Sequence, residues 1–164
     1  MDKSEKMKSY IGSEDDKVYN TSEKWFVREK WAQYALIRKE KNERKFIRLL
    51  TFTSIKAYDI IFLSKKGLIQ TTETGYSPES IAFCEKDYER YTRIYNRLPG
   101  ARGYLGTFEK FVGAGDIGFT DSARKWFPFD VINLDFSGSM FRHEDSNTSK
   151  VMDAILKMFM IQEF

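Results

Sequence analysis

The sequence of 164 residues is poor in the residues that build disulfides and metal sites, since it holds one cysteine and one histidine. The single cysteine, Cys84, excludes an internal disulfide and any zinc site made of several cysteines. The single histidine, His143, could hold a metal only with several carboxylate partners, and we interpret it as a surface loop residue. No apolar run is long enough to cross a membrane and no signal peptide is apparent, so we expect a cytoplasmic protein without a membrane partner.

The composition predicts one domain, because 41% of the residues are hydrophobic and 16% are aromatic, enough for a sizeable core. The net charge is only +3, but it is unevenly spread. The stretch Lys24–Arg48 holds nine Lys or Arg against three Glu, a local excess of six positive charges. Such a stretch is most often a solvated helix face, and the alternative is a surface that binds nucleic acid.

The first part of the chain changes character near residue 20. The first twenty residues are rich in charge and poor in apolar side chains, and we expect a loose segment there. The spacing Asn20-x-x-Glu23 then indicates the start of a helix. Its large rings, among them Trp25, Trp31 and Tyr34, lie between basic residues and are costly to leave in water, so we expect the helix to pack on the domain. The chain is therefore divided into a loose segment (1–20), a basic aromatic helix (21–44) and a core (45–164).

Four stretches are rich in apolar and β-favouring residues, and we predict strands at 46–52, 81–85, 103–108 and 129–136. We expect the last of them, 129–136, to be the strand around which the rest of the fold is arranged. Pro128 opens it, five of its eight residues are apolar, and the turn Ser137-Gly138-Ser139 closes it. This pattern is typical of a strand buried on both faces of a parallel sheet.

Helical spacing of apolar residues predicts helices between and after these strands. Ser54 can cap a helix over 55–64, Asp87 can begin a second, and Thr148 or Ser149 can cap the last. On the second helix we expect a single packed face: Tyr88, Tyr91, Ile94, Tyr95 and Leu98. In the last helix we expect five side chains to point inward: Val151, Met152, Ile155, Met158 and Phe159.

An alternative to the first helix stays open. Residues 59–72 could form a hairpin that turns at Lys65-Lys66-Gly67, although the helical spacing of the apolar residues favours the helix. The stretches 72–78 and 109–123 are predicted to be irregular, apart from a short helical turn near Ala123.

The alternation of strands and helices predicts an α/β fold, with a parallel sheet covered by helices on both faces. Crossovers between neighbouring parallel strands are right-handed, which brings the carboxyl ends of the strands to one rim. On this rim we place four groups: Thr51 to Ser54, Glu85, Thr107 with Phe108, and Asp135 to Gly138. Carboxylates and small hydroxyls in that position suit a ligand that carries a ribose together with an amine or amide.

The run Phe129-Asp130-Val131-Ile132-Asn133-Leu134-Asp135-Phe136-Ser137-Gly138-Ser139 resembles the fourth motif of class I S-adenosylmethionine-dependent methyltransferases. It is most similar to the form of that motif in tRNA guanine dimethyltransferases. The stretch Ile81–Glu85 is similar to the second strand of the family, whose terminal acidic residue holds the cofactor ribose. The resemblance spans about residues 45–164, and it implies a Rossmann-like, methyltransferase-type core.

This resemblance also implies roles for individual residues. The substrate amine or base would be positioned by Asp135, Phe136, Ser137 and Gly138. The cofactor, S-adenosylmethionine, would be bound by Thr51, Thr53, Ser54, Glu85, Lys86, Thr107 and Phe108. Nucleic acid is the implied substrate, with the basic stretch 24–48 as its contact surface.

Two departures from the family pattern have structural consequences. The first motif reads Leu50-Thr51-Phe52-Thr53-Ser54, where the family usually has a glycine-rich loop. The family fold also has about three further strands, so we expect a sheet that is incomplete at its C-terminal end. The stretch Val131–Leu134 would then be an exposed apolar edge, which predicts self-association or a partner chain that completes the sheet.

Two other functions remain open at this point. The chain could be a non-catalytic, Rossmann-like binding module, whose basic helix meets nucleic acid or protein. It could also be a structural subunit in which Glu85 and Asp135 act as caps of turns.

Overall fold

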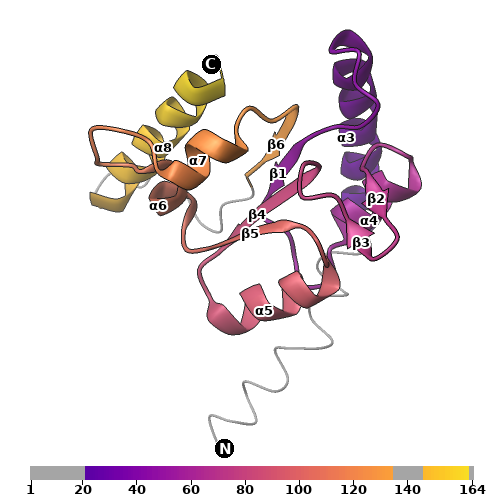
Figure 1. Cartoon of the computed structure of the whole chain (residues 1–164), viewed down its shortest axis with the longest axis horizontal. Helices are drawn as coiled ribbons and strands as arrows, with labels where there is room; N and C mark the ends of the chain where they lie inside the picture. Colours follow the sequence, from indigo (N-terminus) through magenta and orange to yellow (C-terminus); the bar gives the residue numbers. More distant parts are fainter. Residues whose placement is uncertain (1–20, 135–145, 163–164) are drawn as a thin grey trace, which may run out of the picture.

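The computed structural model describes residues 21–134 and 146–162, and it confirms the predicted α/β fold. Its main sheet is parallel and has four strands in the order β5-β4-β1-β6 (Figure 1). The strands are β1 (Leu49–Thr51), β4 (Ile81–Glu85), β5 (Arg102–Leu105) and β6 (Val131–Asn133). The helices are α3 (Ser22–Lys41), α4 (Tyr58–Lys65), α5 (Tyr88–Arg97), α6 (Phe108–Val112), α7 (Asp121–Trp126) and α8 (Ser146–Gln162).

Helices cover both faces of this sheet, as predicted. On one face, β1 and β4 contribute Leu49, Ile81 and Phe83 to a core that they share with α3, α4 and α5. On the other face, Leu50, Ala82 and Cys84 pack against α6, α7 and α8. Figure 1 shows α6, α7 and α8 gathered on one side of the strands, with α3 and α4 on the other. Alternate residues of each central strand therefore enter different cores, which explains why these strands are apolar throughout.

The strand order places the first strand of the chain, β1, between the second (β4) and the fourth (β6). The chain therefore moves outward from β1 to β4 and β5, then returns to the other side of β1. Such a reversal is a topological switch point, and open α/β sheets bind their ligands at the carboxyl ends of the strands beside it. In this protein the switch point lies between β1 and β6.

Side-chain caps fix the starts of several helices. Thr21, Asp87, Thr107 and Thr120 each accept a hydrogen bond from a backbone N–H in the first turn of α3, α5, α6 and α7 respectively. The predicted cap at Ser54 is wrong. Helix α4 begins after Ala57, which adopts the left-handed conformation at φ 51° and makes no side-chain cap.

Helix α4 settles the alternative between helix and hairpin in favour of the helix. The stretch predicted to be a loop at 72–78 contains part of a short antiparallel hairpin, β2 (Thr71–Thr72) with β3 (Gly75–Tyr76). Gly75 allows this turn to approach the next part of the chain, because a Cβ there would lie 2.2 Å from the carbonyl oxygen of Pro99. The stretch 109–123 is only partly irregular, since α6 covers residues 109–112 and α7 covers residues 121–123, and the helical turn predicted near Ala123 is part of α7.

The ends of the strands and the inner face of α8 differ from the sequence prediction. Strands β1 and β6 have three residues each, and β6 is half-buried rather than buried on both faces. In α8, Met158 is buried as predicted, but Met152 and Phe159 are 40% and 60% exposed. On α5, Ile94 is buried, whereas Tyr88 and Tyr95 are exposed. Among the described residues, no helix is long and apolar enough to span a membrane.

Candidate functional site

The rim formed by the carboxyl ends of the parallel strands is the candidate site, because it holds the switch point. Strands β4 and β6 are parallel and lie on either side of β1, as the sequence predicts for the strands that lead to Glu85 and Asp135. The predicted residues Asp135, Phe136, Ser137 and Gly138 lie outside the described residues, so their catalytic role stays a prediction. The described range 21–134 ends one residue beyond β6, and the description resumes at Ser146.

The end of β1 is tied to β6 by side chains and backbone. Thr51 is fully buried, and its hydroxyl accepts a hydrogen bond from the Asn133 amide at 3.2 Å. The N–H of Phe52 donates to the Asn133 carbonyl at 3.1 Å. Thr53 is 6% exposed, and its hydroxyl donates to the carbonyl of Ser54. Thr51 and Thr53 thus point into the protein, and among the predicted hydroxyls of this loop Ser54 keeps partial exposure.

Glu85 ends β4 at the same rim, next to β1. One carboxylate oxygen accepts from the N–H of Asp87 at 2.9 Å, and the other accepts from Nε of Arg90 at 3.2 Å. The side chain is 15% exposed. Each carboxylate oxygen has two acceptor positions, so these two bonds leave acceptor capacity for a ligand. The neighbouring Lys86 is exposed.

Thr107 and Phe108 follow β5 at the rim and have structural roles in the described fold. The Thr107 hydroxyl caps α6 by accepting from the N–H of Lys110. The ring of Phe108 is buried, and it meets the ring of Phe52 edge to face, with 5.8 Å between the ring centroids. This contact links the loop after β1 to the loop after β5, but it leaves little of Phe108 for a ligand to touch.

The basic stretch 24–48 is less available to a partner than its charge implies. Arg28 is buried and forms an ion pair with Asp59 on α4. Arg44 pairs with Asp130 at 3.0 Å, and a guanidinium nitrogen of Arg48 donates to the carbonyl of Trp126 at 2.7 Å. Burial lowers the pKa of Arg48. Three of the nine basic residues therefore hold the domain together rather than forming an open positive surface.

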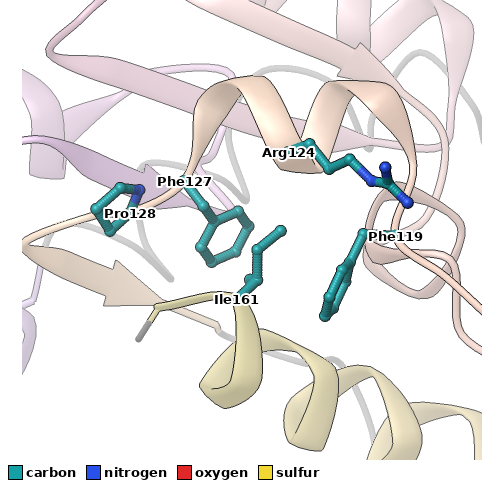
Figure 2. A pocket seen from close by; sticks show the side chains of 5 residues that line it. All are labelled: Phe119, Arg124, Phe127, Pro128 and Ile161. Atoms are coloured by element: carbon teal, nitrogen blue, oxygen red, sulfur yellow. The ribbon is translucent and has the colours of Figure 1, made fainter. Parts of the chain in front are cut away.

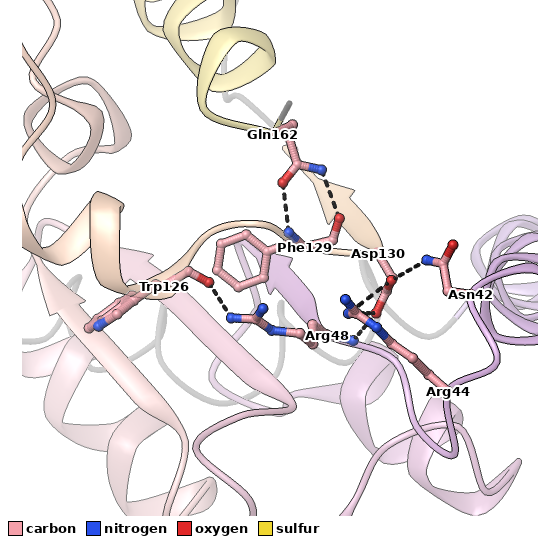
Figure 3. Close-up of polar contacts among 7 residues, drawn as sticks. All are labelled: Asn42, Arg44, Arg48, Trp126, Phe129, Asp130 and Gln162. Carbon is pink, nitrogen blue, oxygen red and sulfur yellow. Dashed lines mark hydrogen bonds and ion pairs between the residues drawn. The ribbon is translucent and has the colours of Figure 1, made fainter. Parts of the chain in front are cut away.

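Two polar arrangements that the sequence reasoning missed lie at the amino end of β6 (Figure 3). The Asp130 carboxylate, 3% exposed, accepts from the Asn42 amide at 2.7 Å, from Arg44, and from the N–H of Arg48 at 2.8 Å. The Gln162 amide accepts from the N–H of Phe129 at 2.6 Å and donates to its carbonyl at 2.7 Å. The position of Asp130 inside an apolar run could have indicated its buried contacts. Nothing in the sequence indicates the contact between Gln162 and Phe129.

A further sequence pattern could be mistaken for a nucleotide site. The loop Gly113-Ala114-Gly115-Asp116-Ile117-Gly118 has the spacing of a dinucleotide-binding fingerprint. It follows helix α6 instead of a strand, and the carbonyls of Gly113, Asp116 and Gly118 accept hydrogen bonds from the Lys157 ammonium. Carbonyls that converge on a cation have the wrong polarity for a phosphate, so this loop is not a phosphate-binding site.

The described residues include neither a reactive thiol nor a cluster of metal ligands. Burial raises the pKa of the Cys84 thiol, which therefore stays protonated and unreactive at neutral pH. Burial also raises the pKa of Tyr91 and of Tyr104. Within 21–134 and 146–162, no three His, Cys, Asp or Glu side chains are placed to share a metal ion.

Two hollows among the described residues are lined by side chains other than Glu85. One, of about 330 Å³, is lined by Phe119, Arg124, Phe127, Pro128 and Ile161 (Figure 2). It lies between α7 and α8 at the amino end of β6, so it is remote from the rim. The other, of about 200 Å³, lies between α3 and β6 and is lined by Trp31, Tyr34, Val131, Ile132 and Asn133.

Comparison with known proteins adds no assignment to this geometry. No family model, no curated protein and no solved structure matches the chain.

Proposed function

We propose that this chain is an S-adenosylmethionine-dependent, methyltransferase-like domain that binds its cofactor at the rim beside the switch point. The observation that carries the proposal is the position of Glu85. It ends the strand next to β1, in a sheet whose strand order reverses at β1. A carboxylate there accepts hydrogen bonds from ribose hydroxyls in dinucleotide-binding folds of this order.

The residues present fit the ribose end of such a cofactor. The Glu85 carboxylate is held in place by Asp87 and Arg90, which orients it without using all of its acceptor positions. Thr51, the last residue of β1, and Thr53, in the loop that follows, are both buried, so their side chains do not project from the rim toward a ligand. When bound, the cofactor would supply an activated methyl group, and the chain would supply orientation.

Calorimetric titration with S-adenosylmethionine tests this proposal. We expect the wild type to bind, and Glu85→Ala to bind about 10- to 150-fold more weakly, from a charged hydrogen bond worth roughly 1.5–3 kcal/mol. Glu79→Ala is the matched control, because Glu79 also pairs with an arginine but precedes β4, at the opposite end of the strand. The control should bind like the wild type.

Two results would count against the proposal. A wild type that releases no heat with S-adenosylmethionine removes the enzymatic interpretation. A Glu85→Ala variant that binds normally but melts at a lower temperature makes Glu85 a cap for the turn before α5, as its bond to the Asp87 N–H also allows. Thermal unfolding of the same variants distinguishes these cases, since a ligand at 100 times its Kd stabilises by about 2.7 kcal/mol.

A second candidate is a non-catalytic module that binds single-stranded nucleic acid through α3. The supporting observation is that α3 exposes the rings of Phe26 and Tyr34, with the Lys30 ammonium 5.4 Å from the centroid of the Phe26 ring. Aromatic platforms with nearby cations are typical of such surfaces. Anisotropy with a labelled oligonucleotide tests it: binding that weakens with salt and is lost in Tyr34→Ala, without any cofactor binding, would favour this function.

A further inference from the structure

Helix α3 carries apolar side chains on the face that points away from the domain. Its packed face is narrow, and the buried residues on it are Arg28, Ala32 and Ala35. A surface helix usually turns a polar face to water. In α3, however, Phe26, Tyr34 and Ile37 are 64%, 67% and 57% exposed. At 3.6 residues per turn, these three side chains lie roughly 130° to 170° around the helix from the centre of the packed face.

The outward residues of α3 include a row with the spacing of a coiled-coil seam. We call this row the α3 seam: Val27, Lys30, Tyr34, Ile37 and Lys41. Its members are separated alternately by three and four residues, which keeps them on one face of a helix and is the spacing by which one helix packs on another. All of them are exposed. With a rise of 1.5 Å per residue, the seam is roughly 21 Å long.

A hollow lies beside the middle of the α3 seam. It measures about 200 Å³ and lies between Trp31 and Tyr34 of α3 and Val131, Ile132 and Asn133 of β6. In helix packing, a side chain of one helix enters a hole between side chains of its neighbour. The hollow offers such a hole for one side chain of a helix that lies along the seam.

The charge of the α3 seam decides which kind of helix it can accept. Lys30 and Lys41 occupy two of the five seam positions, and Arg38 lies beside the seam. Of the two glutamates between residues 26 and 41, Glu29 already forms an ion pair with a lysine of α4. Charges at and beside a seam choose its partner, because like charges across it repel and opposite charges attract. The α3 seam therefore favours an acidic helix.

We propose that the α3 seam is a docking face for an acidic amphipathic helix of a partner protein. The apolar residues of that helix pack on Val27, Tyr34 and Ile37, and its carboxylates pair with Lys30 and Lys41. This mode of recognition uses anchors that recur every three or four residues. The inference goes beyond the cofactor site and does not depend on a ligand at the rim.

Two observations favour a helix over nucleic acid on this face of α3. The seam includes Val27 and Ile37, whose aliphatic side chains lack the flat ring on which a base stacks. The Lys30 ammonium lies 5.4 Å from the centroid of the Phe26 ring, so a cation already covers one face of that ring. Nucleic acid is therefore kept as an outcome of the test.

Fluorescence anisotropy of the full chain with labelled synthetic peptides tests the proposal. Two peptides have four heptads with leucine at the a and d positions, and they carry either glutamate or lysine at the e and g positions. Like charges at those positions keep each peptide from pairing with itself. We expect the acidic peptide to bind at least tenfold more tightly than the basic one, and more weakly in about 0.5 M salt. The acidic peptide in scrambled order should also bind at least tenfold more weakly, because it has no apolar stripe.

Two neighbouring residues of α3 provide a matched pair of variants. Ile37 belongs to the seam, whereas Leu36, which is 44% exposed, lies roughly 100° away around the helix. Glutamine is a good helix former and suits both exposed positions. We expect Ile37→Gln to weaken binding of the acidic peptide about fivefold or more, through the loss of apolar contact. Leu36→Gln should bind like the wild type.

Reversal of the charge on the α3 seam should reverse its preference. In the double variant Lys30→Glu with Arg38→Glu, we expect the basic peptide to bind more tightly than the acidic one. Circular dichroism checks that this variant and the two glutamine variants keep the helical content of the wild type.

Several results would overturn the proposal. Absence of binding to the acidic peptide at about 100 µM would remove the docking face. Equal binding of the acidic, basic and scrambled peptides would show general stickiness, and equal losses in Leu36→Gln and Ile37→Gln would place the contact elsewhere. An oligonucleotide that binds more tightly than the acidic peptide, and no longer binds Tyr34→Ala, would assign the face to nucleic acid. A wild type that dimerises without peptide in sedimentation equilibrium, while Ile37→Gln stays a monomer, would assign it to a second copy of the chain.

Discussion

Replacement of Asp130 by alanine should destabilise the fold strongly, because it removes a buried carboxylate that several segments share. The Asp130 carboxylate joins three segments: Asn42 at the C-cap of α3, Arg44 in the loop that follows, and the N–H of Arg48 just before β1. Its side chain is 3% exposed, so the carboxylate itself is bound by these partners rather than by water.

The expected cost follows from what each partner loses. Breaking a fully buried ion pair costs about 3–5 kcal/mol. Here Arg44 is 37% exposed and Asn42 is exposed, so both regain water, whereas the Arg48 N–H loses its carboxylate partner at a cost of about 1–3 kcal/mol. We expect a total loss of about 2–4 kcal/mol, which is a large part of a typical stability of 5–15 kcal/mol.

Urea unfolding followed by tryptophan fluorescence measures this loss, and thermal unfolding should show a melting temperature lower by roughly 4–16 °C. Glu79→Ala is the control, because its ion pair with Arg102 is more exposed and should be worth about 0–1 kcal/mol. An Asp130→Ala variant within 1 kcal/mol of the wild type would refute the reasoning, since it would mean that the carboxylate network contributes no more than a surface pair.

Two further predictions concern buried groups. Cys84 should react with a thiol reagent in urea and not in the native protein, and stability should fall as the pH rises above about 8.5–9, because the unfolded thiol then releases a proton that burial retains in the folded state. A native thiol that reacts as fast as a free one would contradict the burial. Gln162→Leu should cost about 1–3 kcal/mol in urea unfolding, since both peptide groups of Phe129 lose their partner, whereas Met160→Leu on the same helix should be neutral within 0.5 kcal/mol.

The two central strands, β1 and β4, were predictable because burial on both faces leaves a continuous apolar run in the sequence. The stretch 81–85 was predicted with its correct bounds, since it is an apolar run next to polar residues at both ends. The start of α5 at Asp87 was likewise readable, because capping depends on neighbours in the sequence. Such local rules failed at Ala57, where the left-handed turn that begins α4 has no glycine or asparagine to mark it.

The missed features depend on contacts between distant parts of the chain. Nothing near Gln162 indicates that its amide pairs with Phe129, 33 residues away. The basic stretch 24–48 looked like an external surface because its partners, Asp59 and Asp130, lie outside it. The inward face of α8 was misjudged because its apolar residues exceed one face, so spacing could not show that Phe159 lies outside while Ala154 lies inside.

Hydrogen–deuterium exchange with and without S-adenosylmethionine tests the proposed cofactor site most directly, because it reports where a ligand acts as well as whether it binds. The account predicts slower exchange in two segments of the rim, the loop Phe52–Ala57 and the turn Glu85–Asp87, and unchanged exchange around Asp130 at the other end of β6. Protection confined to other segments, or none at saturating cofactor, would contradict the methyltransferase-like assignment.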